Sequence, residues 1–101
     1  MTQARSDAEF DTERDRIVHR LQVMPERLLE AAYARVLPVL AELRLMTLAV
    51  DPTGPNDVPR LSPRAAGDQV SVITRDFAAG CDDGQRDRAT ELLTGLRRSL
   101  P

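Results

Sequence analysis

The sequence predicts an all-α protein, a four-helix bundle-like domain with a kinked and strongly apolar central helix, packed as a helical dimer. Apolar residues recur at spacings of three and four in four segments, as on one face of a helix. The stretch with the most strand propensity, residues 70–73, has no evident partner strand, and a lone strand is unstable. A chain of 101 residues fits one domain, so we expect a single all-α domain over residues 1–101.

The first predicted helix begins after a flexible end at residues 1–5. Ser6 followed by Glu9 has the spacing of a capping box, which makes Ser6 the expected N-cap. Pro25 either kinks this helix or starts the next one, so we expect a tight elbow at residues 23–25. The apolar stripe of the helix consists of Phe10, Ile17, Leu21 and Met24.

Residues 28–50 form the longest apolar-rich segment and predict the central helix. One apolar stripe consists of Leu29, Ala32, Val36, Val39, Leu43, Met46 and Val50, and a second set lies largely off it: Leu37, Leu40, Leu45 and Leu48. A helix that is apolar on more than one side is usually buried on more than one side. Pro38 removes one backbone hydrogen bond, so the helix either breaks there or continues with a kink. The stripe keeps its phase across Pro38, which favours the kinked continuous helix.

A Pro-rich connection follows at residues 51–62, which we interpret as an extended crossover rather than a partner-binding loop. The third helix is expected to begin with Ser62 as N-cap and Pro63 in its first turn, and to end at Gly80. Its stripe is Ala66, Val70, Ile73 and Phe77. Asp82 or Asp83 is expected to cap the fourth helix, whose apolar face is Ala89, Leu92, Leu93, Leu96 and Leu100.

The composition restricts the class of protein. The net charge is −2, so the chain lacks the basic excess of a nonspecific nucleic-acid or anionic-membrane binder. All 14 basic residues are arginines, as expected for a GC-rich genome, and we take the chain to be bacterial. A single cysteine cannot form an internal disulfide, and the N-terminus has no apolar core of a signal peptide. We therefore expect a cytoplasmic protein that does not interact with a membrane.

Residue types that carry chemistry are sparse. Asp11, Asp15 and His19 share one helix face, which we interpret as a solvated face rather than a metal site. Cys81 precedes two carboxylates, which oppose thiolate formation. No catalytic residue, metal ligand or cofactor is predicted, and the sequence favours a protein that is not an enzyme.

Two alternative functions remain open. The segment around Gly80 suggests a helix-turn-helix, in which Gln85, Arg86 and Arg88 are candidate nucleic-acid-binding residues of a transcriptional regulator or antitoxin-like protein. The other alternative is a small-ligand sensor or small helical enzyme, whose pocket would lie near Pro38. The candidate pocket residues are Tyr33, Leu37 and Pro38.

The favoured hypothesis is a non-enzymatic protein-protein interaction or regulatory protein. The central helix carries more apolar surface than the other helices readily cover, and a second copy of the chain is the simplest partner. The candidate interface residues are Leu29, Val36, Val39, Leu40, Leu43, Met46 and Val50.

Overall fold

A computed structural model describes residues 2–50 and 58–101, with the side chains of residues 7–49 and 58–101. The fold is all-α, as predicted, and its helices pack against one another. The elements are α1 (Thr2–Val23), α2 (Glu26–Val50), a short 3₁₀ turn η1 (Pro63–Ala65), α3 (Ala66–Gly80) and α4 (Asp83–Ser99). No helix in this described part of the chain is both long and apolar enough to cross a bilayer.

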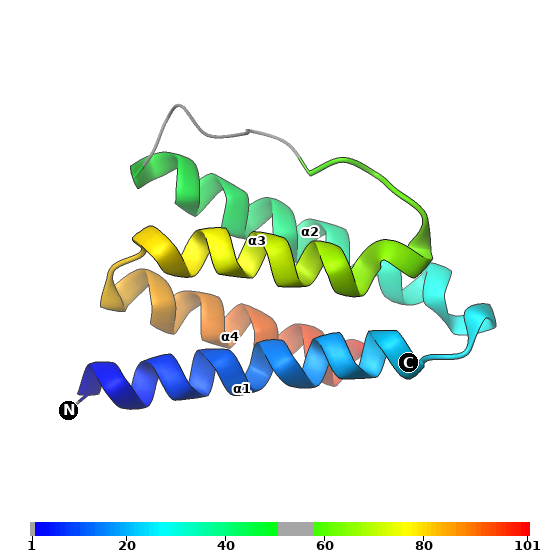
Figure 1. The fold of residues 1–101 in the computed structure, drawn as a ribbon, viewed down its shortest axis with the longest axis horizontal. Helices are drawn as coiled ribbons and strands as arrows, with labels where there is room; N and C mark the ends of the chain where they lie inside the picture. Colours follow the sequence, from blue (N-terminus) through cyan, green and yellow to red (C-terminus); the bar gives the residue numbers. More distant parts are fainter. Residues whose placement is uncertain (1, 51–57) are drawn as a thin grey trace.

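The four helices form a bundle in which each helix packs mainly against two others. α1 and α2 each pack against both α3 and α4. α1 and α4 run in one direction, and α2 and α3 run in the other (Figure 1). Because α3 starts at the end of the bundle where α2 starts, the connection over residues 51–62 joins opposite ends. Most of that connection, residues 51–57, lies outside the described residues.

One apolar core fills the space between the helices. The predicted stripes of α1 and α3 are buried in it, and the rings of Phe10 and Phe77 meet with their centroids 5.7 Å apart. Gly67 brings α3 close to α1: a β-carbon there would lie 3.7 Å from the carbonyl oxygen of Val18. The apolar face predicted for the fourth helix is also buried, apart from a half-buried Leu92.

Helix α1 begins earlier than the sequence pattern predicted. It starts at Thr2, so Ser6 lies inside the helix instead of capping it, and residues 2–5 belong to the helix. The reason is that nothing before Ser6 stops a helix, and Ala4 and Arg5 are good helix formers. The elbow is where it was expected, because α1 ends at Val23 and α2 begins at Glu26.

Helix α2 is continuous through Pro38, as the phase of its apolar residues predicted. Pro38 is solvent-exposed, and so is Ala34, whose carbonyl would otherwise accept the missing hydrogen bond. Water can therefore satisfy that carbonyl, which makes a proline at this position tolerable.

The third and fourth helices begin at the predicted capping residues, with one difference in the hydrogen bonds. Ser62 precedes the 3₁₀ turn, and Pro63 is at its first position, but the Ser62 side chain makes no capping hydrogen bond. Asp82 caps α4, and its side chain accepts from the backbone N–H of Gln85 at 2.7 Å. The Gln85 side chain accepts in return from the Asp82 N–H at 3.0 Å, which completes a capping box.

Candidate functional site

The residues predicted to form a dimer interface lie mostly inside the bundle. Those that are core residues, at most 2% exposed, are Leu29, Val36, Leu40 and Leu43. Val39 and Met46 are half-buried at the edge of the core, and the side chain of Val50 is outside the described ones. α3 and α4 of the same chain cover this face of α2. Any docking surface on α2 must therefore be sought on its other side.

The opposite side of α2 carries a second apolar stripe, which faces solvent. It consists of Ala31, Ala34, Pro38, Ala41, Leu45 and Leu48, and we call it the outer stripe. All are exposed except Leu48, which is half-buried, and Leu45 is 62% exposed. The spacings alternate between three and four, so these residues form one continuous seam along the helix.

Charged residues border the outer stripe but do not interrupt it. Arg35 and Glu42 follow one flank, two turns apart, and both are exposed. Leu37 and Arg44 lie on the other flank, toward α3. The stripe therefore has the arrangement of a helix-pairing seam: an apolar centre with charges at its edge.

A groove adjoins the outer stripe on the α3 side. Its volume is about 320 Å³, and its lining includes Arg44, Leu61 and Val72. Arg44 is only 7% exposed, and its Nη1 lies 3.5 Å from Oδ2 of Asp76. Its Nε has no hydrogen-bond partner among the described residues. A buried guanidinium with so weak a counter-charge costs stability.

The aromatic ring expected to line a ligand pocket instead holds a loop in place. Tyr33 is fully buried, and its hydroxyl donates to Oε1 of Gln69 at 2.6 Å and accepts from the N–H of Leu61 at 2.8 Å. Nε2 of Gln69 donates to the carbonyl of Pro59 at 2.7 Å. The guanidinium of Arg60 lies 5.5 Å from the ring centroid. These contacts fix the chain that enters α3.

The other two candidate pocket residues lie on a different side of α2 from the buried Tyr33. Leu37 is half-buried and Pro38 is exposed, both on the outward side of α2. The groove at Arg44 is lined by other residues of α2, α3 and the segment before η1.

The C-terminal hairpin does not have the geometry of a helix-turn-helix. The two helices of that motif cross at about 90–120° around a short turn. Here α3 and α4 run in opposite directions and lie diagonally across the bundle (Figure 1). Of the three candidate nucleic-acid-binding residues, Gln85 is engaged in the capping box and Arg86 is 8% exposed, which leaves Arg88 on the surface.

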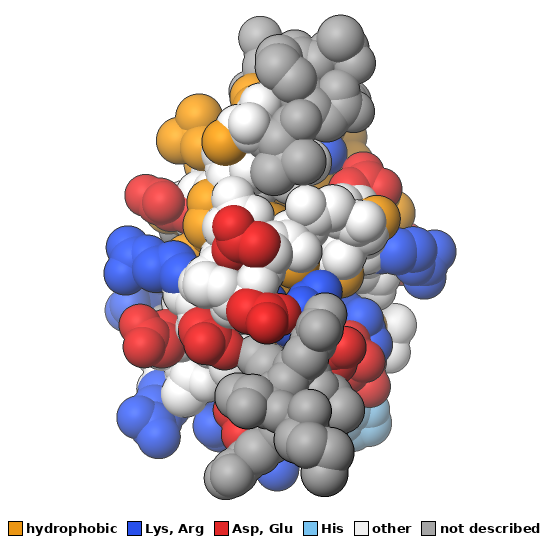
Figure 2. Space-filling view, turned by 90° about the vertical axis from the view of Figure 1, so that its left-hand side faces the viewer, with side chains coloured by type: hydrophobic (Ala, Val, Ile, Leu, Met, Phe, Trp, Pro, Cys, Tyr) orange, Lys and Arg blue, Asp and Glu red, His pale blue; other side chains and the backbone are white. Residues whose placement is uncertain are grey.

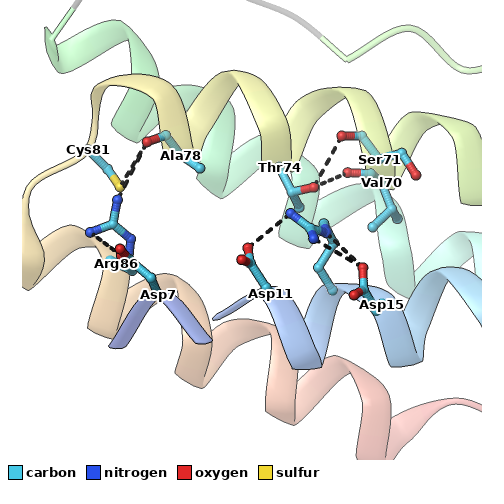
Figure 3. A network of polar contacts seen from close by, with 10 residues as sticks. Asp7, Asp11, Asp15, Val70, Ser71, Thr74, Ala78, Cys81 and Arg86 are labelled. Atoms are coloured by element: carbon cyan, nitrogen blue, oxygen red, sulfur yellow. Dashed lines mark hydrogen bonds and ion pairs between the residues drawn. The ribbon is translucent and has the colours of Figure 1, made fainter. Parts of the chain in front are cut away.

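Arg86 holds the beginning of α4 against α1 and α3 (Figure 3). Its Nη1 lies 2.9 Å from Oδ1 of Asp7 and 3.5 Å from Oδ1 of Asp83. Nη2 donates to the carbonyl of Ala78 at 3.5 Å. The pair with Asp7 is close but not aligned as a hydrogen bond. Arg86 therefore serves the packing of the bundle.

The same end of the bundle carries several carboxylates. Figure 2 shows them across its middle, with arginine side chains on both sides of them and hydrophobic side chains above them, at the height where α2 ends. Asp76, Asp82 and Asp83 are exposed here, beside the start of α4. Carboxylates around this helix start oppose the approach of a phosphate backbone.

The remaining side chains that could carry chemistry are the carboxylates of Asp11 and Asp15 and the thiol of Cys81. Asp11 and Asp15 both pair with Arg14, at 3.1 Å (Figure 3). No three side chains of the types that bind metals come together in the described residues. Burial raises the pKa of the Cys81 thiol above its ordinary 9.0, more than the nearby Arg86 lowers it. The thiol is therefore protonated at neutral pH.

The chain matches no family model, no curated protein and no solved structure in the comparisons made with known proteins. The candidate site therefore rests on the geometry of the bundle. The sequence did contain the signal for the outer stripe, because Leu37, Leu45 and Leu48 fall largely off the buried stripe. What the sequence could not tell is which of the two apolar faces the chain covers itself.

Proposed function

We propose that this chain is a non-enzymatic protein-protein interaction module that docks a partner helix on the outer stripe of α2. The observation that carries the proposal is the exposed apolar seam from Ala31 to Leu48, on a helix whose opposite face is already filled. Single exposed hydrophobic residues are ordinary, whereas larger contiguous apolar patches mark interaction sites. The six members of the outer stripe are aligned along α2 with no charged residue among them.

The physical basis is the transfer of apolar surface out of water. Burying an exposed Leu side chain contributes about 1.5–3 kcal/mol, and Leu45 is the largest strongly exposed member of the stripe. The alanines allow a partner backbone to approach closely. Because the stripe lies on one rigid helix, docking requires no rearrangement of the bundle.

Photo-crosslinking in the source cells tests this proposal. A photoreactive amino acid replaces Leu45 in one strain and Val23, which is 65% exposed at the end of α1, in a control strain. We expect a discrete crosslinked product from position 45 and none from position 23. Crosslinking that is equal at the two positions, or absent at position 45, would contradict the docking role of α2.

A further inference from the structure

We infer that the partner on the outer stripe is a second copy of this chain, with the two α2 helices antiparallel. This inference rests on the proposed function and identifies the occupant of the same surface. It is carried by the distribution of size and charge along the stripe, which is complementary to itself only when one copy is reversed.

Side-chain size is the first line of evidence. Small residues occupy the N-terminal half of the stripe, at Ala31 and Ala34, and large ones the C-terminal half, at Leu45 and Leu48. Antiparallel pairing places Leu45 of one copy opposite Ala34 of the second copy, and Leu48 opposite Ala31. The same register sets Pro38 against Ala41.

Every level of this pairing therefore joins a larger side chain to an alanine. The gap between the helices stays even along the seam, as close packing requires. A parallel pair in register would instead join Leu45 to Leu45 and Ala34 to Ala34. That arrangement holds the helices apart at one end and leaves a void at the other.

Charge is the second line of evidence. Antiparallel pairing brings Arg35 of one copy within about 3 Å, along the helix axis, of the level of Glu42 of the second copy. The two-fold axis generates this contact twice. Both residues are exposed on the same flank of α2, where flanking charges set the orientation of paired helices.

Thiol crosslinking between purified chains tests the register. The background is Cys81→Ser, so that each chain carries one thiol, and the variants are Ala34→Cys and Leu45→Cys. We expect a short thiol crosslinker to join the two variants when they are mixed, and neither variant to itself. A mixture of Val23→Cys with Leu45→Cys is the control and should stay uncrosslinked.

Charge reversal tests the same geometry without cysteines. Arg35→Glu and Glu42→Arg should each weaken self-association by about tenfold, and the double variant should restore it. Self-crosslinking of Ala34→Cys, or a double variant weaker than both single ones, would overturn the antiparallel dimer. Crosslinking of position 45 in cells to a different protein, with no reaction in the purified mixture, would overturn the dimer but leave the docking function standing.

Discussion

The hydroxyl of Tyr33 lies 2.6 Å from Oε1 of Gln69 and links the N-terminal third of α2 to the first turn of α3. Both side chains are buried, so the bond is shielded from water. The same hydroxyl accepts a hydrogen bond from the N–H of Leu61 at 2.8 Å, so one oxygen joins α2, α3 and the segment that connects them.

Replacing Tyr33 by Phe should therefore destabilise the bundle. The change leaves the Gln69 oxygen and the Leu61 N–H without a partner, which costs about 1–3 kcal/mol in the free energy of unfolding. Urea unfolding of Tyr33→Phe and the native chain measures this loss of stability. Thr90→Val is the control, because that hydroxyl only donates to the carbonyl of Arg86 one turn earlier, at 2.9 Å. Equal stability of Tyr33→Phe and the native chain would show that the hydrogen bonds of the Tyr33 hydroxyl are dispensable.

The ion pair between Glu13 and Arg97 predicts a dependence on pH. Nε of Arg97 donates to Glu13 at 2.6 Å, and this hydrogen bond holds the pKa of Glu13 below its ordinary 4.5. The pair therefore adds stability above the unfolded pKa and loses it as the pH falls through the folded pKa. Glu13→Gln should be less stable than the native chain at pH 7, with the difference vanishing in acid.

Urea midpoints of the two chains at several pH values measure this effect. Glu91→Gln is the matched control, because Glu91 is exposed on α4. If the urea midpoint of Glu13→Gln stays below that of the native chain by the same amount down to strongly acidic pH, the stabilising role of the Glu13–Arg97 pair is contradicted.

The buried guanidinium of Arg44 predicts an unusual substitution result. Arg44→Met keeps the length of the apolar stem and removes a poorly paired buried charge, so stability should be unchanged or higher by about 1–4 kcal/mol. Asp76→Asn should instead lower stability, because it removes the close counter-charge that Arg44 has among the described residues, at 3.5 Å. Thermal unfolding of the two variants distinguishes them, and a strongly destabilised Arg44→Met would show that the ion pair is favourable.

The glycine in the C-terminal third of α4 offers a stabilising change. A β-carbon at Gly95 would meet no atom within 4 Å, and the position is exposed. Gly95→Ala should raise stability by about 0.5–1 kcal/mol, because alanine restricts the unfolded chain more than glycine does. Gly67→Ala is the comparison, since its β-carbon would lie 3.5 Å from Cγ of Gln22. A loss of stability for Gly95→Ala would reveal a contact made in an assembly.

The fold was predictable from spacing because every helix carries apolar residues at spacings of three and four, and α1, α3 and α4 each have one such stripe. The stripe from Ala66 to Phe77 and the cap at Asp82 both appear in the structure as the sequence indicated. The predicted start of α1 was wrong, because the residues before Ser6 continue a helix as well as Ser6 could cap one.

The site was harder to predict than the fold. On α2 two apolar stripes share one helix, and only the packing of α3 and α4 decides which one faces inward. Arg86 illustrates the same limit: its charge suggested an exposed contact, yet Asp7, distant in sequence, draws it into the bundle. Such long-range pairings leave no periodic trace in the sequence.

The docking of a second copy on the outer stripe is tested most directly by the mass of the purified chain in solution. Sedimentation equilibrium should give twice the chain mass of 11.2 kDa for the native protein. Leu45→Asp should sediment as a single chain while its circular dichroism spectrum stays unchanged, because Leu45 lies outside the core. A native chain that remains monomeric at every concentration, or a Leu45→Asp variant that still dimerises, would contradict this account.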